Sequence, residues 1–530
     1  MAVRRLGGPG PRRAARGRTG LLLLLAAALY LAAGAASTWP ALRDAETSFL
    51  AGVEHARGAV PAGDHLQASY QLWLPGHQLA RGEPPWRDPY SFQPLAEPRT
   101  TFAGWPFALV YGPLHALFGT VGAWNLLVLL SYVGSGLATF AWLRALEVPR
   151  AAALAGGLAF ALAPYRVAQL AAGHQLALVA LLLPLALYAL ERRRTLLAAV
   201  ALASIPLSGQ VHLALGAIPF VALYAALRPP GDSPRLGARR AAAVALPAVA
   251  AGLLVWAVAI RGSLGAGGRS FAQVERYSVD VGDFASRRVG ADLETFVLLG
   301  WLTPLLALAG FALVTRREPR LAVVLGLAAV VPVLLALGAN LPGYETLWNA
   351  LPGLRETRVP SRFLPLAALA LAGLAAFALA RAPRAAAVAA VALVAVDLRA
   401  DVQLFRPAAA DAGNPVYDAR PAKEPLLELP VYLPDRHEGS VYQYYAIGAP
   451  GPRFGGYSTV APRAVDGRLR ALKPLECGAA VPEPPTWVLV HRGLYTGRPH
   501  CLRRLLEGLS GLGYAEVERD RGLVLYRLKR

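Results

Sequence analysis

Residues 20–37 read GLLLLLAAALYLAAGAAS, a run without any charged side chain. A stretch of about 20 apolar residues is long enough to cross a hydrocarbon core of roughly 30 Å as a helix. Comparable Ala/Leu/Val-rich runs recur as far as residue 398, and the chain is 55% hydrophobic and only 16% charged. A soluble protein carries about 25% charged residues. The sequence therefore predicts a polytopic α-helical membrane protein.

The first apolar run follows a basic N-terminus, residues 1–19, which carries arginines and no acid. Two interpretations fit this pattern. The run could be a secretory signal peptide, because GAAS at 34–37 offers small residues for cleavage. It could equally be a retained first helix, which we favour because many further spans follow. In both cases the chain from residue 38 onward begins outside the membrane.

Eleven apolar stretches are long enough to be candidate spans, and arginines fill every second connection between them. The stretches are roughly 20–37, 122–143, 150–165, 174–190, 194–207, 210–227, 240–261, 294–314, 319–338, 362–380 and 383–398. The arginines lie between the second and third, the fourth and fifth, the sixth and seventh, the eighth and ninth, and the last two. The positive-inside rule assigns these five loops to the cytoplasm.

Residues 105–121, WPFALVYGPLHALFGTV, would be a twelfth span and would reverse most of these loops. We therefore interpret them as a re-entrant or interfacial segment. The prediction is a cytoplasmic N-terminus at 1–19 and a transmembrane domain at 20–398 with a large external loop at 38–104. The tail, 399–530, is then extracytoplasmic, and the protein lies in the inner (plasma) membrane.

The tail differs in composition from the rest. LLELPVYL, TWVLVHR and GLVLYRL are short runs rich in Val, Leu and Tyr, typical of strands, and HCLRRLLEGLSGLGY has helical spacing of its leucines. These patterns predict a small α+β domain. Cys477 and Cys501 both lie here. In an oxidising compartment they could form a disulfide, and two free thiols remain the alternative.

The external loop contains GDHLQASYQLWLPGHQLARGEPPWRDPYSF at 63–92. Leu66, Tyr70, Trp73 and Leu74 follow helical spacing, which predicts an amphipathic helix lying in the interface with its apolar side in lipid. Asp64 begins this helix. It is either a helix cap or a functional acid whose pKa partial burial raises. Asp88, before a proline, is either a turn residue or a second functional acid.

Acids and histidines gather at the outer ends of other predicted spans, whereas the inner loops carry mostly arginine. The residues concerned are Arg166, His174, Asp280, Asp283, Arg358 and Arg362. Each of them alone is explained equally well as an interfacial or structural residue. Together they indicate a polar site that faces outward at membrane depth. Although the net charge is +20, the arginines form short clusters beside the spans, which argues against a nucleic-acid partner.

Several of these segments resemble bacterial GT-C-fold glycosyltransferases and their close relatives. The resemblance is carried by GDHLQASYQLWLPGHQLARGEPPWRDPY, AGHQLALVALLLPLALYALER, YSVDVGDF, ETFVLLGWLTPLLAL, TRVPSRFLPLAALAL, LLELP and GGYSTVAP, in this order. It implies a GT-C-like fold and a transferase that uses a polyprenyl-phosphate sugar as donor. The sugar, a hexose or pentose, would pass to a glycan, lipid or protein acceptor on the outer side of the membrane.

The same resemblance implies roles for individual residues. An acid of the first external loop acts near the acceptor hydroxyl or binds a divalent metal, which makes Asp64 the first catalytic candidate and Asp88 the second. Arg358 and Arg362 are candidates for the donor phosphate, because arginine binds phosphate oxygens bidentately. Arg166 and His174 are lesser substrate-binding candidates, together with Asp280 and Asp283 of YSVDVGDF. The loop has no tight pair of acids, so metal dependence stays open.

Two other functions fit the same sequence. A transporter or flippase for a lipid-linked sugar would also place polar residues at membrane depth, but usually with charges in mid-span and paired repeats. Almost no acid lies in the middle of a predicted span, which favours an interfacial site over a path through the membrane. A non-catalytic scaffold with an external binding domain is the second alternative.

Overall fold

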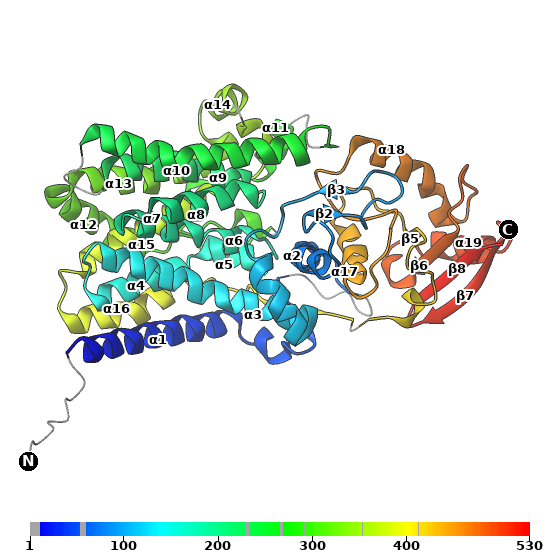
Figure 1. Ribbon diagram of the computed structural model, residues 1–530, viewed down its shortest axis with the longest axis horizontal. Coiled ribbons are helices and arrows are strands. Elements are labelled where there is room, and N and C mark those ends of the chain that lie inside the picture. The colour runs from blue at the N-terminus through cyan, green and yellow to red at the C-terminus, as the bar shows by residue number, and fades with distance from the viewer. Residues whose placement is uncertain are drawn as a thin grey trace, which may run out of the picture.

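The computed structural model describes residues 11–52, 60–228, 233–264, 269–290, 292–351, 353–411 and 413–529. The molecule is elongated, with a bundle of long helices at one end and a mixed region of helices and short strands at the other (Figure 1). The N-terminal helix lies along the edge of the bundle, and the C-terminus lies at the far end of the mixed region, which we call the outer region.

The bundle is built from the apolar stretches. Its helices are α1 (Pro11–Thr38), α3 (Ala108–Ala145), α4 (Arg150–Ala161), α5 (Pro164–Ala171), α6 (Leu176–Val179), α7 (Leu182–Glu191), α8 (Thr195–Leu207), α9 (Val211–Leu227), α10 (Pro234–Val255), α12 (Leu302–Arg317), α13 (Pro319–Ala336), α15 (Leu364–Leu379) and α16 (Arg384–Asp397). Each predicted span contains at least one of them. A π-helical turn, Trp256–Ile260, continues α10.

Five of the described helical segments are long and apolar enough to cross a membrane, and a sixth is added if the bent pair α4–α5 counts as one span. The predicted number of eleven crossings therefore stays a prediction. The segment Pro360–Leu379, which includes α15, is the most central of the five, with 72% of its apolar window buried. The corresponding share is only 17% for α1 and for α10 with its π-helical turn, so these two form the rim.

The helix α3 contains the segment that we predicted to be re-entrant or interfacial. Its helical geometry is interrupted at Gly119, whose φ of 67° and ψ of −175° suit glycine. The part before Gly119 therefore does not continue the axis of the part that follows.

The helix α2 (Asp64–Ala80) corrects one expectation. Its apolar residues Leu66, Tyr70, Trp73 and Leu74 are buried, and it packs against α3 and against α17 of the outer region. The prediction that this face lies in lipid was wrong. Helical periodicity identifies an apolar face, but not whether lipid or protein covers it.

The outer region contains β1 (Ser48–Ala51), β2 (Arg87–Asp88), β3 (Arg99–Thr100), β4 (Arg406–Ala409), β5 (Leu426–Leu429), α17 (Ser440–Gly448), α18 (Arg463–Leu472), β6 (Trp487–His491), α19 (Pro499–Gly508), β7 (Tyr514–Asp520) and β8 (Leu523–Leu528). Two short helices, α11 (Phe271–Arg276) and α14 (Tyr344–Ala350), lie beside the bundle instead and pack near α9 and α13 (Figure 1). The strands β5, β6 and β8 and the helix α19 lie in the runs that composition marked as strand and helix.

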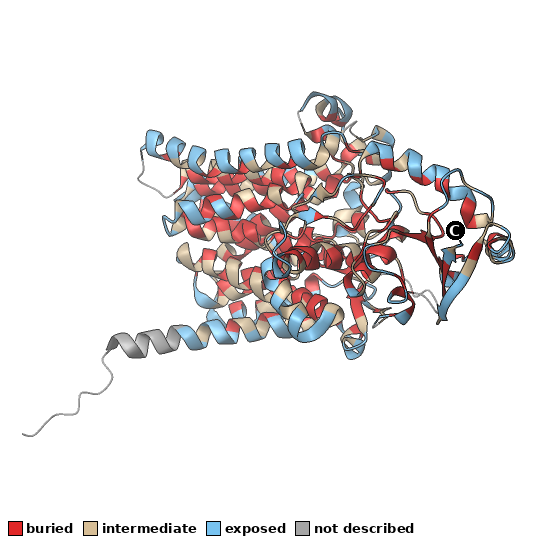
Figure 2. Cartoon of the chain, turned by 45° about the vertical axis from the view of Figure 1, so that its right-hand side comes forward, coloured by how far each residue is buried: buried red, intermediate tan, exposed pale blue. Residues whose placement is uncertain are grey.

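These strands form three small sheets. The largest has the order β5-β6-β8-β7, in which β5 and β6 are parallel and the other pairs antiparallel. Strand β1 pairs with β4, and β2 pairs with β3. Cys477 and Cys501 form a disulfide beside α19. Buried residues continue from the bundle into the outer region (Figure 2), because Tyr442 and Tyr444 of α17 belong to the same apolar core as the bundle helices.

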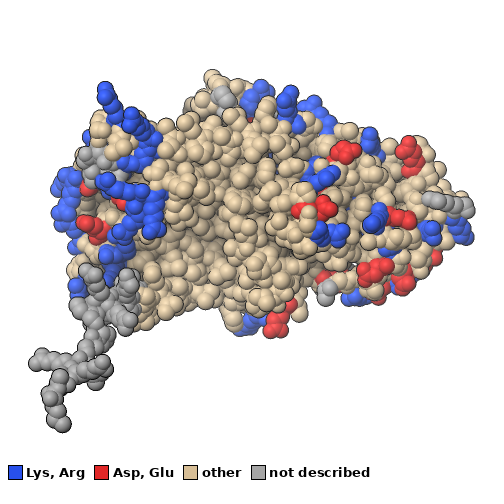
Figure 3. Space-filling model, viewed as in Figure 1, with Lys and Arg blue, Asp and Glu red and all other residues tan. Residues whose placement is uncertain are grey.

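Charged residues are confined to the two ends of the face seen in Figure 3. Lysines and arginines gather at the end of the bundle that points away from the outer region, where the predicted cytoplasmic loops lie, and the broad surface between the ends carries almost no charge. This is the distribution that a bilayer and the positive-inside rule favour.

Candidate functional site

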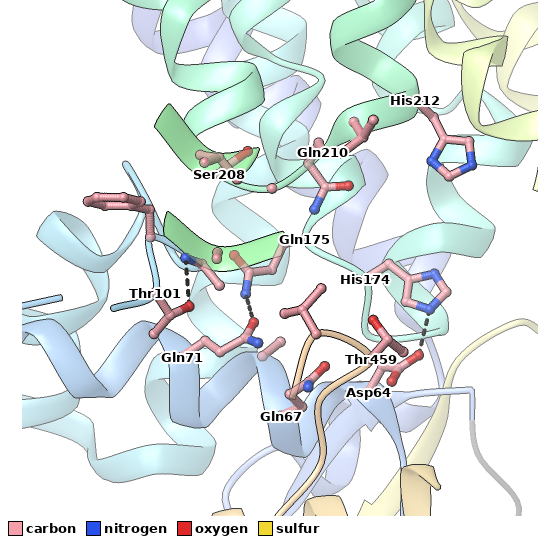
Figure 4. A pocket seen from close by; sticks show the side chains of 18 of the residues that line it. Asp64, Gln67, Gln71, Thr101, His174, Gln175, Ser208, Gln210, His212 and Thr459 are labelled. Atoms are coloured by element: carbon pink, nitrogen blue, oxygen red, sulfur yellow. Dashed lines mark hydrogen bonds and ion pairs between the residues drawn. The ribbon is translucent and has the colours of Figure 1, made fainter. Parts of the chain in front are cut away.

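A cavity of about 290 Å³ lies where the bundle meets the outer region (Figure 4). The lining comes from the first half of α2, residues 101–103, the α5–α6 turn, the α8–α9 turn, the outer end of α10 with its π-helical turn, Arg269, and residues 356–362. Residues 457–460, within the GGYSTVAP motif, close one side. The cavity thus collects segments far apart in the sequence, at the outer ends of helices, as the sequence predicted for a polar site.

Asp64 is the first residue of α2, and its side chain points toward His174 (Figure 4). Its Oδ2 lies 2.7 Å from His174 Nε2, and its buried Oδ1 has no hydrogen-bond partner among the described residues. The helix is capped by Gly63, without a side-chain cap bond. The interpretation of Asp64 as a helix cap is therefore wrong.

His174 is held between Asp64 and Gln169. Gln169 donates its amide N–H to Glu294 Oε2 over 2.8 Å, and its amide oxygen lies 2.8 Å from His174 Nδ1. The other ring nitrogen, Nε2, lies against the Asp64 carboxylate. The imidazole ring therefore links the acid at the start of α2 to the buried network around Glu294.

The environment of Asp64 shifts its pKa downward. Burial raises the pKa of this carboxyl, but the hydrogen bond and charge of His174, the charge of Arg362 and the Tyr457 hydroxyl lower it more, and the net shift is below the ordinary 3.8. The expectation that burial would raise the pKa was wrong, because the sequence did not show that two cations lie beside the acid. Asp64 is consequently a carboxylate at neutral pH.

Glu294 is the second acid of this network and lies almost entirely buried at 6% exposure. Its Oε1 accepts hydrogen bonds from Nε and Nη2 of Arg362, and its Oε2 accepts from the Tyr165 hydroxyl as well as from Gln169. Burial raises the pKa of Glu294, but the charges of Arg362 and His174 lower it by a larger amount. The net pKa of Glu294 therefore lies well below its ordinary range. Glu294 therefore neutralises Arg362 and fixes the orientation of Gln169.

Two other arginines, Arg269 and Arg358, face the same cavity. Among the described residues neither forms an ion pair within 4 Å, and the Arg358 guanidinium lies 5.9 Å from the centroid of the Tyr277 ring. Burial and the charge of Arg358 lower the pKa of Arg269, whereas the carboxylate of Glu356, which lines the same cavity, raises it. Two neighbouring guanidiniums beside a single carboxylate leave a net positive face that favours an anion.

His212 fixes the segment that carries Arg358. Its Nε2 accepts the backbone N–H groups of Arg358 and Val359 at 3.2 and 3.3 Å. The ring is therefore an acceptor at Nε2 and is not available there for a ligand. It holds the start of TRVPSRF against the outer end of α9.

The structure brings together half of the residues predicted for the site. Asp64, His174, Arg358 and Arg362 line one cavity. The other four, Asp88, Arg166, Asp280 and Asp283, lie outside it.

Asp88 lines a neighbouring cavity and is 2% exposed. Its Oδ1 accepts the Tyr70 hydroxyl at 2.6 Å and the backbone N–H groups of Tyr90 and Ser91. These contacts match the alternative of a turn residue before a proline.

Arg166 is buried between helices, where its guanidinium donates to the backbone oxygens of Ala161 and Ser131. It therefore ties α3 to the α4–α5 bend. Asp280 and Asp283 form a capping box in an outer loop, and Asp280 also accepts from Asn340. None of these three side chains lines the cavity.

Sequence reasoning assigned no role to Glu294, Gln169 or Arg269. Glu294 belongs to the acids of the outer loop and opens the resembling segment ETFVLLGWLTPLLAL, and these were the two signals for it. Gln169 and Arg269 carried no signal, because a single glutamine or arginine in a turn or loop is usual. Their importance appears only from the neighbours that folding gives them.

The donor set around Asp64 does not fit a divalent metal ion. Among the residues that the structure describes, no group of three or more His, Cys, Asp and Glu side chains is placed to hold one. Asp64 and Glu294 are separated by the His174 ring, and Glu294 is committed to Arg362. We therefore derive no step through a metal.

Comparison with known proteins identifies the fold. The arabinofuranosyltransferase AftD from Mycobacteria superposes with a TM-score of 0.58 at 16% identity, over 96% of this chain and 40% of that one. ArnT from Cupriavidus metallidurans in the apo state superposes with a TM-score of 0.50 at 15% identity, over 97% of this chain and 98% of that one. The chain has a GT-C fold. The resemblance inferred from sequence motifs is thereby confirmed at the level of fold.

The GT-C fold here spans about 40% of the length of AftD. ArnT from Cupriavidus metallidurans has also been solved bound to undecaprenyl phosphate, and that structure superposes with a TM-score of 0.47 at 13% identity. No protein-family model and no curated protein sequence matches the chain.

Proposed function

We propose that this protein is a membrane glycosyltransferase that transfers a pentose or hexose from a polyprenyl-phosphate donor to a hydroxyl group of a glycan, lipid or protein. One observation carries the proposal. The Asp64 carboxylate shares a cavity with Arg269 and Arg358, which form no ion pair within 4 Å among the described residues. A base for a hydroxyl and cations for a phosphate in one cavity are what this transfer requires. The GT-C fold supports the same function.

The reaction in this cavity is a single displacement. The acceptor hydroxyl gives its proton to the Asp64 carboxylate while its oxygen forms a bond to the anomeric carbon of the donor. The bond between that carbon and the phosphate oxygen breaks, and its electron pair leaves on the polyprenyl phosphate. A positioned general base contributes typically ~10²–10⁴-fold. Arg269 and Arg358 stabilise the charge that develops on the departing phosphate.

His174 and Glu294 act as positioning residues for the base. The His174 imidazole holds Asp64 Oδ2 through a hydrogen bond and so fixes the orientation of the carboxylate at the cavity. Glu294 and Gln169 fix the ring from behind. Arg362, which the sequence placed on the phosphate, is paired with Glu294. We therefore assign the phosphate to Arg269 and Arg358 and give Arg362 a structural role.

The charge distribution supports the proposed orientation. The arginine-rich end of the bundle is assigned to the cytoplasm by the positive-inside rule (Figure 3). The cavity then opens on the extracytoplasmic side of the inner membrane, together with the outer region. A lipid phosphate and a water-borne acceptor meet at this depth.

The test is sugar transfer by the purified protein in detergent, with a panel of polyprenyl-phosphate pentoses and hexoses as donors and octyl glycosides as acceptors. Asp64→Asn keeps the shape of the side chain but is not a base. We expect it to lower transfer by ~10²-fold or more with an unchanged melting temperature. Asp280→Asn, outside the cavity, is the matched control. A folded and fully active Asp64→Asn variant contradicts the proposal.

The same preparation distinguishes the two alternatives. A flippase moves a lipid-linked sugar without breaking the bond to phosphate, whereas a transferase releases free polyprenyl phosphate. Mass spectrometry of the lipid products separates these outcomes. A scaffold produces neither the released lipid phosphate nor movement of the donor between leaflets in proteoliposomes.

A further inference from the structure

A second cavity of about 440 Å³ lies directly beside the first. The two share six lining residues: Gln71, Thr101, Ala103, Ala259, Tyr457 and Val460. The second cavity extends from this common wall toward α17 and the start of α18 in the outer region. A ligand that occupies it therefore borders the cavity that contains Asp64.

The lining of the second cavity is rich in hydrogen-bonding groups. It contains the Tyr70 and Ser458 hydroxyls, the Asp88 carboxylate, the Arg99 guanidinium and the Gln443 amide. Arg99 donates from Nη1 to Ser458 Oγ and to the Val460 backbone oxygen, at 3.2 and 3.0 Å. Planar polar side chains of this kind fix the orientation of a ligand by paired hydrogen bonds.

Two buried atoms in this lining lack a partner among the described residues. Gln443 is only 4% exposed, and its amide nitrogen donates to the Tyr457 backbone oxygen at 3.1 Å, while its Oε1 accepts nothing. The Nε–H of Arg99 donates to nothing. An unpaired buried polar group costs about 1–3 kcal/mol. An unpaired acceptor and an unpaired donor among the residues that line one cavity match a ligand with hydroxyl groups, which both donate and accept.

We propose that the second cavity binds the sugar units of the acceptor that precede the reacting sugar, so that the acceptor is an oligosaccharide chain. The inference rests on the proposed transfer and names its acceptor class. A lipid tail fits poorly, because it would place hydrocarbon against the polar side chains of this lining. A carbohydrate offers hydroxyl groups to them, and it borders the first cavity at the wall that contains Tyr457 and Thr101.

The test uses octyl glycosides that contain one, two or three units of the same sugar, with the donor that the wild-type protein turns over. We expect kcat/KM to rise at least tenfold from one unit to two. Gln443→Leu removes the unpaired acceptor, and Thr100→Trp adds bulk to the cavity at an exposed strand residue. In both variants the ratio of the two-unit to the one-unit kcat/KM should fall toward one.

Gln93→Leu, a half-buried glutamine outside both cavities, is the matched control and should keep the wild-type ratio. If Gln443→Leu has a lower melting temperature than the wild type, the kcat/KM ratio of Thr100→Trp decides between the outcomes. A wild-type ratio near one, or a ratio that both variants preserve, overturns the inference while the transfer itself stands.

Binding is measured separately, by saturation-transfer NMR of the two-unit octyl glycoside with the Asp64→Asn protein. We expect the double variant Asp64→Asn/Gln443→Leu to lose this signal. An equal signal in the single and the double variant overturns the inference. If no donor is turned over but this binding is present and lost in the variant, the transferase proposal fails and the carbohydrate site remains.

Discussion

Gly173 lies so close to the first turn of α2 that a Cβ on it would be 2.2 Å from the backbone nitrogen of His65. It also has a φ of +83°, which glycine adopts readily and L-residues rarely adopt. Gly173 precedes His174, and His65 follows Asp64. Because Gly173 has no side chain, Asp64 and His174 can come into contact.

Gly173→Ala should consequently separate His174 from Asp64. We expect a loss of transfer of at least tenfold, together with a lower melting temperature. Gly343→Ala is the matched control, because Gly343 has a φ of +81° but open space around it. It should show only the cost of the backbone strain, about 1–3 kcal/mol. Equal effects in both variants would mean that the close approach to α2 has no role.

Arg269 and Arg358 should bind the phosphate of the donor. Replacing either by Ala should raise the donor Kd by roughly 10- to 150-fold, since a hydrogen bond to a charged group contributes about 1.5–3 kcal/mol. Lys should rescue poorly because it lacks the planar fork. The measurement is equilibrium binding of the polyprenyl-phosphate sugar. Arg276→Ala, an exposed arginine on α11, is the control, and unchanged affinity in both Ala variants would contradict the assignment.

Arg362 should behave differently, since its partner is a protein acid. Arg362→Ala leaves Glu294 buried without its cation and should lower stability by about 3 kcal/mol, because Arg362 is mostly buried at 21% side-chain exposure. The double variant Glu294→Gln/Arg362→Met should recover part of this loss. Thermal unfolding in detergent measures both. No loss in the single variant would return Arg362 to the candidates for phosphate binding.

The same pair predicts a pH dependence. Burial raises the pKa of Glu294, but Arg362 and His174 lower it more, so the folded-state pKa lies below the ordinary 4.5. A depressed pKa stabilises the fold fully above pH 4.5, and this stabilisation is lost as pH falls toward the folded-state value. The difference in melting temperature between the wild type and Glu294→Gln should therefore narrow below pH 4.5. A constant difference would show that Glu294 is not the titrating group.

The disulfide between Cys477 and Cys501 closes a loop with a sequence separation of 24 residues. The chain-entropy model gives about 3–4 kcal/mol of stabilisation for such a loop. Replacing both cysteines by serine should lower the stability of the outer region by that amount. Mass mapping of unreduced peptides checks the bond itself. Two free thiols in protein taken from the membrane would also argue against an extracytoplasmic tail.

The sequence predicted the location of the bundle helices well, because an apolar run of this length and composition has few other outcomes. It also located β5, β6, β8 and α19, whose residues combine strand or helix propensity with clear ends. It did not predict that the apolar face of α2 packs against protein. Leu66 and Trp73 would look the same beside lipid as beside α3 and α17, so tertiary packing alone decided that they are buried.

The site divides in the same way. Asp64, His174 and Arg358 lie in segments that resemble known GT-C proteins, so the motifs pointed to them. The pairing of Arg362 with Glu294 required two segments separated by 68 residues to meet. The downward pKa shift of Asp64 likewise required His174, 110 residues away in the sequence, and Arg362 to lie beside it. The ion pair and the pKa shift depend on which charged side chains lie beside one another in the folded chain. Neither the periodicity nor the composition of the sequence predicts these neighbours.

The pairing of β1 with β4 joins residues 48–51 to residues 406–409. During synthesis β1 emerges first, and almost the whole bundle must be inserted before its partner strand exists. Until then β1 presents an unpaired edge on the outer surface. A contact of such long sequence separation forms late and slowly. Assembly of the outer region is thereby delayed until the last bundle helix is in place. The cavity beside α2 closes at the same stage, so an incompletely inserted chain does not have it.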